Sequence, residues 1–191
     1  MKGVLDIEGK KIEVDFSNGI DISIPLLFNG EQPNTYNVNK AISKAYEDEN
    51  FIGDTRRGGP CNFETYSFTP HCNGTHTECI GHITKKRVSI LTSLKQEMIA
   101  STVISVAPKN TNENYIPKLN KDDLVITKKS LELELKNVDP CLLNGLVIRT
   151  LPNTQCKKNR DYMNNTPPFL SVDAMDYIVN LGVKHLLIDT P

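Results

Sequence analysis

Residues 71–82 read His71-Cys72-Asn73-Gly74-Thr75-His76-Thr77-Glu78-Cys79-Ile80-Gly81-His82, and they hold three of the chain's four histidines. Imidazole nitrogen, thiolate sulfur and carboxylate oxygen are the side-chain atoms that bind zinc and its transition-metal neighbours. This stretch therefore predicts a metal site.

The same stretch is predicted to form a β-strand that gathers the ligands on one face. Alternate side chains of a strand share a face, so Cys72, His76 and Glu78 would project together, with Gly74 leaving room for an ion. His71 has the opposite parity and joins them only if a bulge inserts one residue. Periodicity thus favours Cys72 as the third ligand, whereas imidazole is the better ligand for a catalytic metal, so both His71 and Cys72 stay candidates.

His82 lies six residues beyond His76, past the end of the expected strand. It is either a further ligand or a general acid/base, because the unperturbed pKa of imidazole is close to neutrality. Gly74 and Gly81 suit backbone that packs close to an ion or substrate, or a turn that needs a positive φ. The alternative interpretation is an ordinary strand with buried cysteines, but His and Glu side chains gathered on one face favour a metal.

The spacing Gly74-Thr75-His76-x-Glu78-x-Ile80-x-His82 resembles the signature His-x-Gly-Thr-His-x-Asp-x-Pro-x-His of the metal-dependent cyclase and kynurenine formamidase family. Three further stretches resemble the same family in the same order: residues 21–26, 146–150 and 182–191.

Position by position, the resemblance implies metal ligands at Cys72, His76 and Glu78 and a catalytic histidine at His82. It also implies a divalent metal, zinc first and manganese as the alternative, and a homodimer. The implied fold is mixed α/β, a barrel-like and largely antiparallel β-sheet with flanking helices. The family takes further His and Glu ligands from a later segment, so we expect a single domain over 1–191 that is C-terminally incomplete.

The predicted activity is hydrolysis of a carbon–nitrogen bond in an amide such as an N-formyl aryl amine. In this hypothesis the metal activates water and His82 transfers the proton. Two alternatives remain open: a non-catalytic protein of the same fold that binds a metal or small acid, and a metal-dependent lyase or ring-closing enzyme.

Composition narrows the class of partner. The formal net charge of −1, from 22 basic and 23 acidic residues, offers no basic excess for nucleic acid and favours a small-molecule substrate. The 5 cysteines are an odd set without a Cys-x-x-Cys pair, and no apolar run reaches the length of a membrane span. These features predict a protein of the reducing cytoplasm.

The remaining secondary structure follows from periodicity and capping signals. A β-hairpin is predicted over residues 4–16, a short strand over 21–26, a helical turn near 41–46, and β-structure over 62–69. Further strands are predicted within 98–106, 142–150 and 183–188. Thr127 and Ser171 are predicted to cap two helices, the second of which ends at Gly182.

Overall fold

The computed structural model describes all 191 residues, and the chain folds into two compact parts. The larger part comprises residues 1–22, 78–154 and 166–191. The smaller part comprises residues 23–77 and 155–165. The larger part contains helices and strands, and the smaller part contains a pair of strands and short helical turns. The fold class is therefore mixed α/β.

The larger part begins with an antiparallel hairpin of β1 (Lys2–Ile7) and β2 (Lys10–Asp15), as the alternating sequence predicts. Its two-residue turn uses positive φ at both positions, 51° at Glu8 and 83° at Gly9. Such turns match the right-handed twist of the strands that they join.

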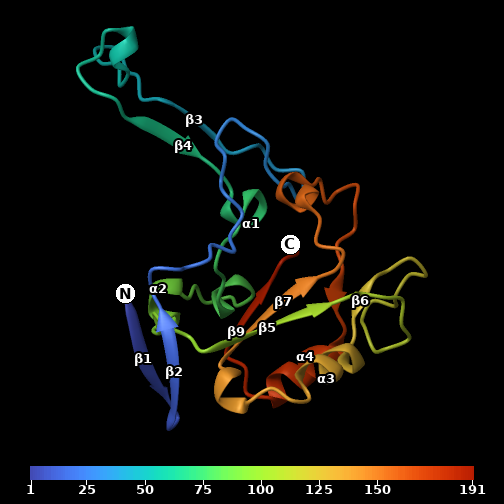
Figure 1. The fold of residues 1–191 in the computed structure, drawn as a ribbon. Coiled ribbons are helices and arrows are strands. Elements are labelled where there is room, and N and C mark those ends of the chain that lie inside the picture. Colours follow the sequence, from blue (N-terminus) through green and yellow to red (C-terminus); the bar gives the residue numbers. More distant parts are fainter. The chain divides into compact units, whose positions relative to one another are not determined.

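A three-stranded parallel sheet, in the order β5-β7-β9, is the centre of the larger part. Its strands are β5 (Ser101–Val106), β7 (Gly145–Thr150) and β9 (His185–Ile188), which confirms the three predicted strands. Helices α3 (Lys128–Leu135) and α4 (Val172–Asn180) lie along one face of this sheet (Figure 1).

The core of the larger part lies between that sheet face and the two helices. Alternation along the strands turns one set of side chains toward the helices. The buried cluster comprises Ile104 and Val106 from β5, Ile126, Leu131 and Leu135 around α3, Leu143, Leu146 and Ile148 around β7, and Ala174 and Ile178 from α4.

Both capping predictions are confirmed. The Thr127 hydroxyl accepts a hydrogen bond from Ser130 N–H at 3.2 Å, and the Ser171 hydroxyl accepts one from Ala174 N–H at 3.0 Å. Gly182, after the end of α4, has a φ of 78°, as a residue that ends a helix often does. The caps follow a small parallel pair, β6 (Val125–Ile126) and β8 (Phe169–Leu170).

Short elements complete the larger part. They are the one-turn helix α2 (Ile90–Ser93) and the 3-10 turns η2 (Ile80–His82) and η3 (Pro140–Leu142).

The smaller part contains an antiparallel pair, β3 (Ile42–Ala45) and β4 (Glu64–Ser67), and three short helical turns. The turns are η1 (Thr55–Arg57), α1 (Pro70–Asn73) and η4 (Gln155–Asn159). The helical turn predicted near 41–46 is therefore wrong. Pairing with β4 makes this segment a strand, since β-structure depends on its partner more than on local preference.

The strand predicted over residues 21–26 needs correction, and the predicted barrel stays a prediction. Residues 21–26 form no strand, because Ile24 N–H donates to a side chain, the Thr75 hydroxyl, at 2.8 Å instead of to a neighbouring strand. The strands form four separate sheets, two antiparallel and two parallel, without a closed barrel, so barrel closure stays an expectation. None of the helices is both long and apolar enough to cross a membrane.

Candidate metal centre

The strand predicted to put Cys72, His76 and Glu78 on one face is wrong, and a single helical turn stands at the start of this stretch. Pro70 occupies the first position of α1, where its fixed φ fits and its missing N–H costs nothing. Cys72 N–H and Asn73 N–H both donate to Thr69 C=O, at 2.9 and 3.0 Å. The face-sharing argument for Cys72, His76 and Glu78 therefore does not hold in the folded chain.

His71 and His76 lie together in the smaller part. His71 Nδ1 is 3.1 Å from His76 Nε2, and the ring centroids are 5.0 Å apart in an edge-to-face arrangement. His76 Nδ1 is 3.0 Å from Gly74 C=O. Because a carbonyl only accepts, Nδ1 of His76 carries the proton and donates, so the Nε2 lone pair of a neutral His76 is directed at His71.

Cys72 has a different environment from its neighbour His71. It is buried, whereas His71 is half-buried. Burial also raises the pKa of the Cys72 thiol, which disfavours the thiolate that a metal would need. The helical turn thus separates two residues that the sequence leaves as alternatives.

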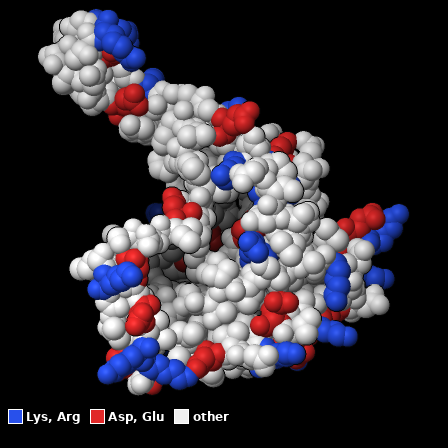
Figure 2. Space-filling view, in the orientation of Figure 1, with Lys and Arg blue, Asp and Glu red and all other residues white.

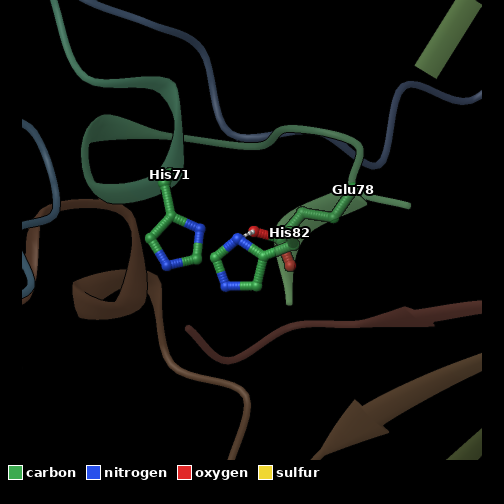
Figure 3. A group of neighbouring side chains, drawn as sticks. All are labelled: His71, Glu78 and His82. Atoms are coloured by element: carbon green, nitrogen blue, oxygen red, sulfur yellow. Dashed lines mark ion pairs between the residues drawn. The ribbon is translucent and has the colours of Figure 1, made fainter. Parts of the chain in front are cut away.

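Glu78 and His82 lie together in the larger part. A carboxylate oxygen of Glu78 is 3.4 Å from His82 Nδ1, and Figure 3 shows this ion pair as a dashed line. His82 ends the 3-10 turn η2, which closes with a bond from His82 N–H to Cys79 C=O at 2.9 Å. A carboxylate beside Nδ1 fixes the orientation of an imidazole.

The two glycines of the motif differ in what they require. A Cβ at Gly81 would lie 2.3 Å from Val88 C=O, so only glycine allows this close approach beside His82. Gly74 is extended, with φ 174°, and a Cβ there would make only an ordinary contact of 3.7 Å with Leu26. The close approach at Gly81 is thus to the backbone of Val88, and the predicted packing of these glycines against an ion or substrate stays a prediction.

The fourth histidine, His185, belongs to neither of these pairs. His185, at the start of β9, is half-buried and its Nε2 is 3.1 Å from the Gln96 side-chain oxygen.

Figure 2 shows Lys and Arg interspersed with Asp and Glu on the face in view, in keeping with the net charge of −1.

The sequence did not single out Tyr36, which the fold places beside His71. Their rings are nearly parallel, with an interplanar angle of 11° and centroids 6.0 Å apart. The two residues are 35 positions apart, and no motif links them.

One comparison with known proteins gives a match. The model of the family described as "Putative cyclase" matches residues 17–191, which includes every residue of the motif. No curated protein and no solved structure matches the chain.

Proposed function

Because the chain belongs to the cyclase family over residues 17–191, we propose that it is a metal-dependent hydrolase that cleaves the carbon–nitrogen bond of an N-formyl aryl amine. The ion would be zinc or manganese, held by His71, His76 and Glu78. Cys72 is the weaker candidate for the third position because it is buried and its thiol pKa is raised.

The geometry of the two imidazoles is the observation that carries this proposal. Ligand nitrogens about 2.0–2.1 Å from a tetrahedral zinc are about 3.3 Å apart, and His71 Nδ1 and His76 Nε2 are separated by 3.1 Å. The bond from His76 Nδ1–H to Gly74 C=O is the kind of outer contact that fixes the tautomer of a metal-binding histidine. The separation of the two nitrogens is thus suited to a divalent ion that would replace the proton shared between them.

Glu78 is proposed as the carboxylate ligand from its place in the chain. It follows His76 by two residues, which span at most about 7 Å along the backbone.

In this proposal His82 carries the proton chemistry. A divalent ion, when bound, lowers the pKa of a coordinated water toward neutrality and polarises the amide carbonyl. His82 would accept the proton from the attacking water and return it to the nitrogen of the departing amine. Glu78, 3.4 Å from His82 Nδ1, would hold the imidazole so that Nε2 faces the substrate and would stabilise the imidazolium.

The proposal is tested by hydrolysis of N-formylaniline, followed as release of aniline and formate. Protein loaded with zinc or manganese should turn the substrate over, dialysis against a chelator should abolish turnover, and the metal should restore it. His82→Gln should lower kcat by about 10²- to 10⁴-fold while the bound metal stays the same.

His185→Gln is the matched control, because it removes an imidazole that bonds Gln96 and lies outside the proposed site. Its kcat should equal that of the wild type. A wild type that binds the metal stoichiometrically but hydrolyses no formyl amide would contradict the proposal and favour a binding protein of the same family.

A further inference from the structure

Tyr36 occupies a backbone conformation that a bulky residue rarely adopts. Its φ is 55°, and the next residue, Asn37, has a φ of 53°. Asn tolerates the left-handed region because its short polar side chain can hydrogen-bond to nearby backbone, whereas the Tyr side chain has no such compensation. Such strained residues persist only where their surroundings hold them, and they cluster at binding sites.

The turn that carries Tyr36 is fixed on both sides. The Asn34 side chain donates to Val38 C=O at 2.8 Å, which closes the turn around Tyr36. The Asn34 backbone bonds the segment after η4: its N–H donates to Arg160 C=O at 3.1 Å and its C=O accepts from Tyr162 N–H at 2.9 Å. These contacts hold the strained pair in place within the smaller part.

The turn carries the side chain of Tyr36, which is largely exposed to solvent. Tyr36 is 71% exposed although its ring lies almost parallel to that of His71, 6.0 Å away. His71 in turn is 3.1 Å from His76, so the exposed ring stands beside the two imidazoles to which we assign the ion. A buried core contact cannot explain the strain, since most of the ring is in contact with solvent.

We propose that Tyr36 is a specificity-determining residue that stacks against the planar aryl group of the amide. This inference rests on the proposed function and assigns a residue to the recognition of its substrate. Offset stacking of aromatic rings is worth about two- to tenfold in affinity beyond simple burial. Tyr36 would therefore favour aryl amides over alkyl amides of the same size.

The test compares N-formylaniline with N-formylcyclohexylamine, whose saturated ring has the same size but no π-face. Tyr36→Asn removes the ring and keeps a residue type that tolerates φ near 55°. The KM for the aryl substrate should rise about two- to tenfold, and the KM for the cyclohexyl substrate should change by less than about twofold. Tyr36→Phe, which keeps the ring, should show the smaller aryl loss.

Two results would overturn the proposal: an equal effect on both substrates, or none on either. An equal effect combined with loss of bound zinc would show that Tyr36 supports His71 and reads no substrate.

A binding measurement separates this proposal from the proposed function. Ligand-observed NMR with zinc-loaded protein and N-formylaniline reports contact with the ring without any turnover. If the wild type is inert but binds the aryl ligand, and Tyr36→Asn weakens that binding, the hydrolase proposal fails while the role of Tyr36 stands. If Tyr36→Asn binds as the wild type does, the role of Tyr36 fails.

Discussion

Nδ1 of His71 lies 3.1 Å from Nε2 of His76, although His71 belongs to the helical turn α1 and His76 to the irregular segment after it. The contact needs the turn at Pro70–Asn73, because a continuous strand would place residues of opposite parity on opposite faces. The geometry therefore favours His71 over Cys72 as the partner of His76.

Substitution of these neighbours should separate a ligand from a core residue. Loss of a residue that only orients a metal ligand weakens metal binding by about 10- to 100-fold. His71→Ala should weaken zinc binding by more than this, because it removes a proposed ligand. Cys72→Ser should keep the zinc affinity and lower the free energy of unfolding by about 1–3 kcal/mol, because it buries a hydroxyl. Competition with a chromophoric chelator measures the zinc affinity, and thermal denaturation measures the stability. Loss of zinc affinity in Cys72→Ser but not in His71→Ala would show that the Cys72 thiolate is the ligand.

Thr75 has a structural role that can be measured locally. Its hydroxyl accepts from Ile24 N–H at 2.8 Å, so Thr75→Val should remove a bond worth about 0.5–1.5 kcal/mol and speed hydrogen exchange at the Ile24 amide. Thr75→Ser keeps the hydroxyl and should exchange as the wild type does. Unchanged exchange in Thr75→Val would show that this bond does not hold the segment.

Local sequence rules predicted most of the larger part. Residues 2–15 alternate apolar and polar side chains around a Glu-Gly turn, and they form the expected hairpin. The hydroxyls of Thr127 and Ser171 cap the expected helices, since a cap depends only on residues within one turn. The apolar runs that become β5 and β7 are buried strands because helices cover their shared face.

The predictions that failed depend on a partner distant in sequence. Residues 42–45 became a strand because residues 64–67 pair with them, and residues 21–26 lost their strand because Thr75 takes the Ile24 N–H. At the candidate site the residue types alone indicated a metal. The choice of tautomer at His76 and the position of Tyr36 depend on Gly74 C=O and on a strained turn, which residue types do not reveal.

Gly81→Ala should reduce turnover through His82. The added Cβ would lie 2.3 Å from Val88 C=O, so η2 must shift and carry His82 with it. A misplacement of about 1 Å can cost about 10²-fold in rate, and we expect a kcat loss of that order. Gly19→Ala, in the same part and with nothing within 4 Å of its Cβ, is the control and should keep full kcat. Equal activity of both variants would show that η2 tolerates the displacement.

The 3-10 turn η1 should lose its stability at acid pH. Both carboxylate oxygens of Asp54 accept from the Arg56 guanidinium at 2.9 Å, and this bond holds the pKa of Asp54 below its ordinary value. A depressed folded pKa means that the stabilisation is complete above the ordinary aspartate pKa and is lost as pH falls through the depressed value. The protection factors of the Arg56 and Gly59 amides, calculated after correction for the intrinsic dependence of exchange on pH, should fall over that range.

Asp54→Asn is the control for this titration. The Asn amide oxygen can still accept from the Arg56 N–H but cannot ionise, so protection at Arg56 should no longer change as the pH falls through the aspartate range. An acid-induced opening that persists in this variant would have to come from another group.

The proposed metal centre is tested by the metal content of the purified protein after equilibration with zinc, compared with that of His76→Gln. We predict one tightly bound ion per chain in the wild type and its loss in the variant, since His76 presents the Nε2 lone pair beside His71. A wild type without stoichiometric metal, or a variant that keeps it, would contradict the assignment of these histidines to a metal centre.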